Sequence, residues 1–106
     1  MKQIPQIQQW TGPEILRTLY IHREELHRMG VYRLGLFGSY LRGTAKSDSD
    51  MDFLVVLERP SFDDYMDVKF FLEDLFQRQV DLVLEDNLKA GLRPYIMNEV
   101  TYVSGL

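Results

Sequence analysis

Apolar side chains recur with helical spacing in two long stretches of the chain, residues 11–29 and 61–79. The first stretch opens with Thr11 and Glu14, which have the spacing of a capping box, and a glycine follows its last residue. The second stretch opens with Ser61, three residues before an aspartate, and its apolar residues form one stripe. The pattern therefore predicts a long helix in each stretch.

Three short runs between and after these helices are rich in apolar and β-branched residues, as is typical of strands. They cover residues 31–37, 51–58 and 80–86, and the second run is apolar enough for a strand that is buried on both faces. We also expect a short helix from Ser39 and another within residues 92–103, followed by a brief extended tail. The alternation of helices and strands predicts the α/β class, with helices packed on a single sheet.

The composition is that of one folded domain, which we expect to span residues 1–106. Hydrophobic residues make up 45% and charged residues 26% of the chain, and the net charge of -4 opposes binding to nucleic acid. The N-terminus lacks the apolar region of a signal peptide, and the longest apolar run, residues 53–57, is too short to span a bilayer. The chain contains no cysteine, so we expect a cytoplasmic protein without a disulfide framework.

Two aspartates stand at the head of the predicted strand 51–58. Asp50 and Asp52 are two residues apart, so a strand would place both carboxylates on one face, where their charges repel each other. A divalent cation between them would relieve the repulsion, and carboxylate oxygens favour Mg²⁺ or Mn²⁺. The same residues also fit a polar turn that only leads into a strand.

Three other motifs for ions or phosphates are excluded. Phe53 and Arg59 stand where an EF-hand needs glycine and a bidentate glutamate. The residues after Gly43 are threonine and alanine, where a Walker A loop needs lysine and serine or threonine. Gly35 and Gly38 are three residues apart, where the dinucleotide fingerprint needs two.

A Gly-Ser pair follows the predicted strand 31–37, ten residues before the aspartate pair. Backbone N–H groups at the start of a helix attract phosphate, Gly38 would let a phosphate come close, and Ser39 adds a hydroxyl donor. In this arrangement the turn would hold phosphates, and the aspartates would hold a metal ion that bridges them.

The stretch "GSYLRGTAKSDSDMDFLVV" resembles a known pattern. Gly38 and Ser39, then ten residues, then Asp50 and Asp52 are similar to the signature of the polymerase-β-like nucleotidyltransferases. This resemblance implies a single nucleotidyltransferase domain with a small mixed β-sheet and helices packed on it. Two further residues match the minimal subgroup of this superfamily and are implied, with Gly38 and Ser39, to bind the nucleotide: Arg42 and Ser49.

The resemblance also demands a third acidic residue on a later strand, and Asp81 meets that demand. It implies that Asp50, Asp52 and Asp81 are catalytic and bind two Mg²⁺ ions, with Mn²⁺ as an alternative metal, and that ATP is the substrate. The other interpretation of Asp81 is a strand carboxylate in water. His22 falls on the apolar stripe of the first helix, and we interpret it as a partly buried histidine rather than a metal ligand.

Minimal members of the superfamily act as antitoxins of HEPN-domain ribonuclease toxins, to which they transfer AMP on a tyrosine. The resemblance therefore implies a protein adenylyltransferase whose partner is a HEPN toxin. Two alternatives stay open, namely an antitoxin that neutralises by docking alone and a nucleotidyltransferase that modifies a small molecule such as an antibiotic. The chain has no residues left to build an acceptor-binding domain, which counts against the small molecule.

Overall fold

The structure is a computed structural model that describes residues 9–106. Its elements, in chain order, are α1 (Gly12–Ile21), α2 (Arg23–Arg28), β1 (Val31–Phe37), α3 (Ser39–Arg42), β2 (Met51–Leu57), α4 (Phe62–Phe76), β3 (Val80–Leu84), the 3₁₀ helix η1 (Glu85–Asn87), α5 (Arg93–Glu99) and β4 (Thr101–Tyr102). All three predicted strands and the two short predicted helices are confirmed. Most of the N-terminus that we expected to lack a signal peptide, residues 1–8, lies outside the described part.

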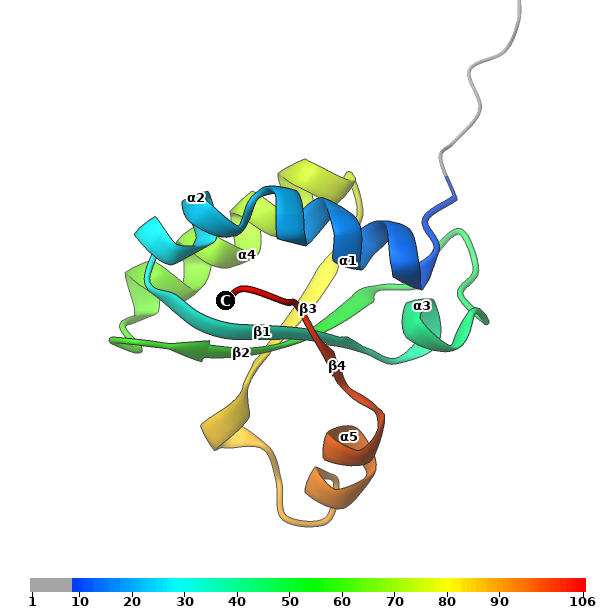
Figure 1. The fold of residues 1–106 in the computed structure, drawn as a ribbon. Helices are drawn as coiled ribbons and strands as arrows, with labels where there is room; N and C mark the ends of the chain where they lie inside the picture. The colour runs from blue at the N-terminus through cyan, green and yellow to red at the C-terminus, as the bar shows by residue number, and fades with distance from the viewer. Residues whose placement is uncertain (1–8) are drawn as a thin grey trace, which may run out of the picture.

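The strands form one mixed sheet in the order β3-β2-β1-β4. β1 pairs antiparallel with β2 and with β4, whereas β2 pairs parallel with β3. Figure 1 shows α1, α2 and α4 on one side of this sheet and η1 and α5 on the other. The predicted α/β class, with a small mixed sheet and helices packed on it, is therefore confirmed.

The core lies between the sheet and the helices α1, α2 and α4. On β2, the neighbouring residues Phe53 and Leu54 point to opposite faces and are both 0% exposed, so this strand is covered on both faces as predicted. Phe53 stacks on Phe76 of α4 with ring centroids 6.0 Å apart. Trp10 packs edge-on against the same Phe76, and its indole N–H donates to the Phe76 carbonyl.

The first predicted helix, residues 11–29, is interrupted at His22, and α1 and α2 lie on either side. His22 has φ -95° and ψ 16°, outside helical geometry, and its Nδ1 lies 2.9 Å from a carboxylate oxygen of Glu25. Leu19 and Leu26 are both fully buried, so the apolar spacing continues across the break and could not reveal it. The His22 side chain is partly buried, as expected, and lies edge-on to Phe71.

Glu85 ties the end of β3 to β1 and β4. Its carboxylate accepts hydrogen bonds from Arg33 Nη2 at 3.0 Å and from the Tyr102 hydroxyl at 2.8 Å, and the Glu85 side chain is only 13% exposed. The Arg33 guanidinium also lies 4.8 Å from the centre of the Tyr102 ring. The Glu85 carboxylate, just after β3, thus links β3 to the pair β1 and β4, from which β2 separates it in the sheet.

We expect Glu85→Ala to lower the free energy of unfolding by about 2 kcal/mol, because it leaves the Arg33 charge and the Tyr102 hydroxyl partly buried without their acceptor. Urea denaturation of the variant and the unmodified chain measures this difference. Glu58→Ala, which removes an exposed carboxylate, is the matched control and should change the free energy by less than about 0.5 kcal/mol. Equal stability of the Glu85 and Glu58 variants would contradict the assignment.

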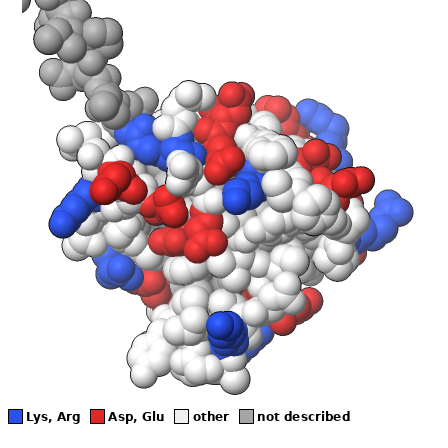
Figure 2. Space-filling model, turned by 180° about the vertical axis from the view of Figure 1, so that it is seen from behind, with Lys and Arg blue, Asp and Glu red and all other residues white. Residues whose placement is uncertain are grey.

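Charged side chains of both signs are interspersed over the face seen in Figure 2, where Asp and Glu gather near the middle and Lys and Arg lie scattered around them. Within residues 9–106, no helix is long and apolar enough to cross a membrane.

Candidate functional site

The mixed sheet brings the three predicted acidic residues to one end of its strands. Because β1 and β2 are antiparallel, the end of β1 meets the start of β2, where Phe37 pairs with Asp52. Asp52 in turn pairs with Asp81 at the start of β3, and residues in register on neighbouring strands point to the same face. Asp50 precedes β2 by one residue. The fold therefore brings together residues that are distant in the sequence.

Asp52 is the partly buried member of this group, whereas Asp50 and Asp81 are exposed. The pKa of Asp52 is raised from its ordinary value to about 6, first by burial of the side chain and then by the neighbouring charges of Asp81 and Asp50. The guanidinium of Arg42 acts against this rise. Asp52 therefore lies in a crowded group of carboxylates whose negative charges repel one another.

Gly38 places the predicted phosphate turn directly against Asp52. Its φ of 82° lies in the left-handed region, and a Cβ atom built on Gly38 would lie 2.1 Å from Asp52 Oδ2. Only glycine fits here, both for its backbone conformation and for the space that the carboxylate occupies. The Gly-Ser turn and the aspartate pair, separated by ten residues in the sequence, are thus in contact.

The remaining predicted nucleotide-binding residues are spread over α3 and the loop that follows it. Ser39 is the first residue of α3 and Arg42 is the last. The Ser49 hydroxyl accepts a hydrogen bond from the Lys46 backbone N–H at 2.9 Å, so this side chain is turned toward its own loop. The structure thus brings Ser39 and Arg42 to the Gly38 turn, while Ser49 stabilises the loop leading to Asp50.

Glu99 is a member of this site that the sequence reasoning missed. Its Oε2 accepts a hydrogen bond from the Gly38 backbone N–H at 3.0 Å, and its Oε1 accepts one from Arg42 Nη1. Burial alone would raise the pKa of Glu99, but the hydrogen bonds from Gly38 and Arg42 and the Arg42 charge outweigh burial and lower that pKa. Glu99 is 61 residues from Gly38 in the sequence, and no motif spacing connects the two.

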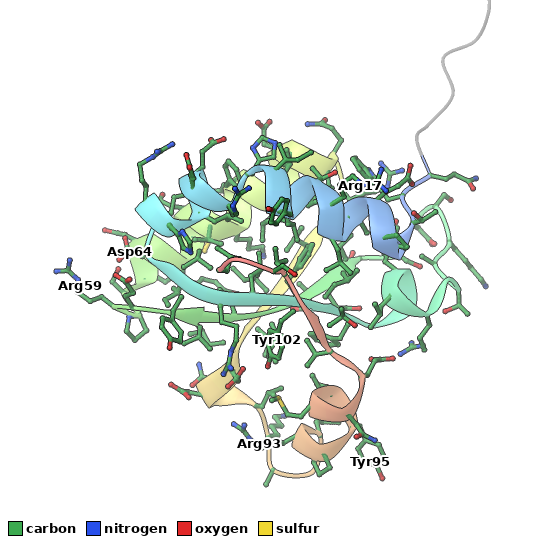
Figure 3. All side chains as sticks on the ribbon, in the orientation of Figure 1. Arg17, Arg59, Asp64, Arg93, Tyr95 and Tyr102 are labelled. Atoms are coloured by element: carbon green, nitrogen blue, oxygen red, sulfur yellow. The ribbon has the colours of Figure 1, made fainter. Side chains whose placement is uncertain are left out.

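Gly38, Arg42, Asp52 and Glu99 line a hollow of about 490 Å³, a volume within the range of small-molecule sites. Its lining comes from the end of β1, from α3, from β2 and from α5. Tyr95 lies on its rim, projecting from α5 into solvent with 76% of its surface exposed (Figure 3). The lining residues are Phe37, Gly38, Arg42, Asp52, Tyr95, Ile96 and Glu99.

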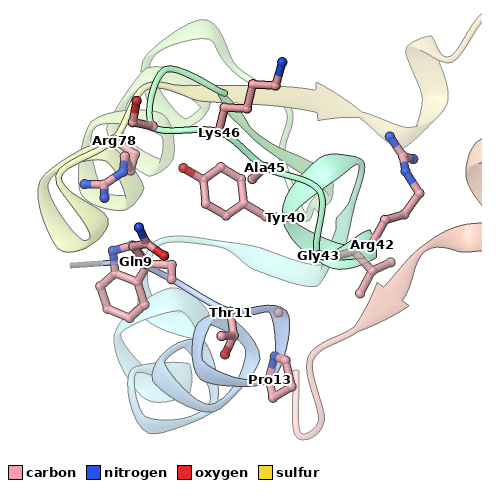
Figure 4. A pocket seen from close by; sticks show the side chains of 13 residues that line it. Gln9, Thr11, Pro13, Tyr40, Arg42, Gly43, Ala45, Lys46 and Arg78 are labelled. Atoms are coloured by element: carbon pink, nitrogen blue, oxygen red, sulfur yellow. The ribbon is translucent and has the colours of Figure 1, made fainter. Parts of the chain in front are cut away.

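A larger hollow of about 770 Å³ lies beside α1, α3 and the loop after α3. Figure 4 shows Tyr40 pointing into it and Arg42 pointing to a different side of α3, with Lys46 and Arg78 at its border. No aspartate or glutamate belongs to its lining among the described residues. Although it is the larger of the two, this hollow is therefore not where the acidic residues act.

The donor atoms of the acidic group fit a hard divalent cation, because they are carboxylate oxygens whose mutual repulsion a cation would relieve. The side chains as they lie are not a finished metal cage: within residues 9–106 no three acidic, histidine or cysteine side chains converge on one point. The acidic group thus fits a divalent cation by the chemistry of its oxygen atoms, and not by a preformed arrangement of ligands.

Comparison with known proteins supports the same assignment. Residues 19–103 match the nucleotidyltransferase domain family. The chain is 45% identical over 95 residues to the protein adenylyltransferase MntA of Thermococcus cleftensis, covering 88% of this chain and 96% of that protein. It superposes with a TM-score of 0.67 on a solved structure described as a minimal nucleotidyltransferase, at 37% identity and over 81% of this chain and 93% of that one.

A second solved structure, a toxin–antitoxin complex with AMP-PNP, matches with a TM-score of 0.67 at 22% identity, over 84% of this chain and 73% of that one. This likeness supports the fold. Together with the family match over most of the chain, it confirms the resemblance to the polymerase-β-like superfamily. The chain belongs to the nucleotidyltransferase domain family and is a minimal nucleotidyltransferase.

Proposed function

We propose that the chain transfers AMP from ATP to a hydroxyl group of a partner protein, a HEPN-domain toxin that it thereby neutralises. One observation supports the nucleotide chemistry: Asp52 lies against the Gly38 turn and lines the same hollow as Gly38 and Arg42, and it is in register with Asp81 on the neighbouring strand. The transfer to protein is supported by the relative MntA, which is a protein adenylyltransferase. The toxin partner is supported by the structural neighbour that is a toxin–antitoxin complex.

The triphosphate would bind to donors at the Gly38 turn. The Gly38 N–H and the Ser39 hydroxyl would donate to phosphate oxygens, and Arg42 would add a positive charge and a planar pair of donors. Ser49 would join them only if its hydroxyl leaves the Lys46 backbone N–H, from which it accepts a hydrogen bond. These contacts would orient the α-phosphorus toward the acidic group, and orientation is the main contribution of a protein to phosphoryl transfer.

Asp50, Asp52 and Asp81 would hold two Mg²⁺ ions, or Mn²⁺, which when bound neutralise the charge that builds up on the phosphates. The acceptor oxygen would form a bond to the α-phosphorus while the bond to the bridging oxygen of the β-phosphate breaks. Pyrophosphate leaves, and AMP stays on the acceptor. Asp81, an exposed member of the group, would receive the proton of the attacking hydroxyl.

A protein acceptor fits the surface next to the site. Just before α5 and along it, beside the hollow, Leu92, Tyr95 and Met97 are exposed by 52%, 76% and 37%. Exposed aromatic and apolar side chains in one place favour contact with another protein. The acidic net charge disfavours a nucleic acid as acceptor. We further propose a cytoplasmic location, a single domain over residues 1–106 and a tyrosine as the target in the toxin.

Label transfer tests this function. The chain is incubated with α-³²P-ATP, Mg²⁺ and a HEPN-domain toxin, and we expect label on the toxin as AMP, released by phosphodiesterase. Chelation with EDTA should remove the label, and added Mg²⁺ should restore it, because the carboxylates alone leave the phosphate charge uncompensated. A toxin that is neutralised without incorporating label would replace this proposal with neutralisation by docking.

A further inference from the structure

The two donors that a triphosphate would need at the Gly38 turn both bind Glu99. Glu99 accepts the Gly38 N–H through one carboxylate oxygen and the Arg42 guanidinium through the other. Gly38 and Arg42 both line the hollow that contains Asp52, and Glu99 lines it too. A single carboxylate thus satisfies one backbone donor and one cationic donor, which is the pair of contacts that a phosphate oxygen group makes.

The position of Glu99 is otherwise unfavourable for an anion. It is the last residue of α5, and the C-terminal end of a helix carries partial negative charge, which disfavours a carboxylate there. Its charge also acts on the carboxylate of Asp52 and disfavours its ionised form. Because both neighbours repel it, the contacts with Gly38 and Arg42 are what hold Glu99 in the hollow. An arriving anion that makes the same contacts would compete with it directly.

Resting on the proposed function, we infer that Glu99 holds the donors that a nucleotide phosphate would use, so that the triphosphate must displace it and Glu99 sets the nucleotide affinity. Each nucleotide that binds gains the Gly38 and Arg42 contacts but breaks those of Glu99. The observed affinity is thus lower than the intrinsic affinity of the site by the fraction of chains in which Glu99 is already released. Glu99 is then a residue that tunes affinity, and α5 is the element that nucleotide binding frees.

Two variants of Glu99 separate this role from a structural one. Glu99→Gln keeps the size of the side chain but loses its charge, and Glu99→Ala removes both acceptors. If Glu99 competes with phosphate, ATP with Mg²⁺ should bind about tenfold more tightly to Glu99→Gln than to the unmodified chain. Glu99→Ala should show at least as large a gain in affinity. If Glu99 instead holds Gly38 and Arg42 in a binding-ready position, both variants should bind ATP more weakly. The direction of the change therefore decides between the two roles.

The measurement is isothermal titration calorimetry of the full chain with ATP and with inorganic tripolyphosphate, both with Mg²⁺. Tripolyphosphate shows the competition at the phosphate donors alone, so its affinity should rise by the same factor as that of ATP. The matched control is Glu24→Gln, which removes the same charge from an exposed position on α2 and should leave both affinities within twofold. Thermal unfolding of each variant verifies that the chain is folded.

The failure of this inference is distinct from the failure of the proposed function. Unchanged or weaker binding to both Glu99 variants, with ATP bound by the unmodified chain, overturns the competition while leaving the nucleotide site in place. Tighter binding of ATP but not of tripolyphosphate also overturns it, because the gain would then lie outside the phosphate donors. If neither the unmodified chain nor the variants bind ATP or tripolyphosphate, both the competition and the proposed nucleotide function are contradicted.

Discussion

Asp52→Asn is expected to lower AMP transfer by about 10³-fold and yet to make the metal-free chain more stable. Transfer falls because the amide cannot supply the charge with which Asp52 would hold a metal ion against the triphosphate. Stability rises because a neutral group at this position removes the cost of burying the Asp52 charge and, in addition, its repulsion with Asp81, which is in register, and with Asp50. A residue that served only the fold would lose stability and activity together.

The sign and the pH range of this stabilisation follow from the pKa of Asp52. In the folded chain the pKa is about 6, above the ordinary value of 3.8, so between these two pH values the folded state binds more protons than the unfolded state. The free energy of unfolding therefore falls as the pH rises from about 4 to about 6, and Asp52→Asn removes this loss. The shift of about two units corresponds to about 3 kcal/mol, and because the side chain is partly exposed we expect about 1–2 kcal/mol at pH 7.

Urea denaturation without metal at pH 4 and pH 7 measures the stability, and labelled ATP measures the transfer. The gain in stability of Asp52→Asn should be present at pH 7 and small at pH 4. Asp48→Asn, which changes an exposed aspartate in the loop after α3, is the control and should alter neither quantity appreciably. An Asp52 variant that is less stable than the unmodified chain at pH 7 would mean that the carboxylate is a structural group.

The parts of the site that could be predicted are those that a short stretch of sequence contains. Gly38, Ser39, Asp50 and Asp52 lie within fifteen residues of one another, and their types and spacing indicate phosphate and metal chemistry before any contact is known. The structure adds the physical reason for the glycine, since a Cβ atom on Gly38 would collide with Asp52. Asp81 could be anticipated only because the resemblance required a third acidic residue.

The parts that could not be predicted depend on contacts between distant segments or on single backbone angles. Glu99 reaches Gly38 because β4 pairs with β1 and so places α5, which precedes β4, next to the Gly38 turn. The spacing of apolar residues does not predict this pairing. The helix predicted for residues 61–79 ends at Phe76, because Gln77 adopts a left-handed conformation with φ 54°. A glycine is the usual signal for such an end, and here none stands at that position.

The second large effect is expected from Asp81→Asn, which separates catalysis from docking. The amide keeps the size of the side chain and the pairing of β3 but cannot accept the proton of the attacking hydroxyl, a role worth about 10²–10⁴ in rate. Asp81 is exposed and outside the contacts of Gly38 and Arg42, and Asp50 and Asp52 remain to hold a metal ion against the triphosphate. We therefore expect ATP to bind within a few-fold of its affinity for the unmodified chain. Transfer should therefore collapse while nucleotide binding survives.

Label incorporation into the HEPN toxin and the affinity for that toxin are measured together for Asp81→Asn, with Asp86→Asn as a control that changes an exposed aspartate of η1. We expect the Asp81 variant to dock normally, because an amide of the same size changes little contact area, and to incorporate almost no label. Incorporation within a few-fold of normal would make Asp81 a solvated strand carboxylate with no part in the reaction. Neutralisation of the toxin by a variant that transfers no AMP would show that docking suffices. AMP transfer by Asp50 and Asp52 would then not be required for neutralisation.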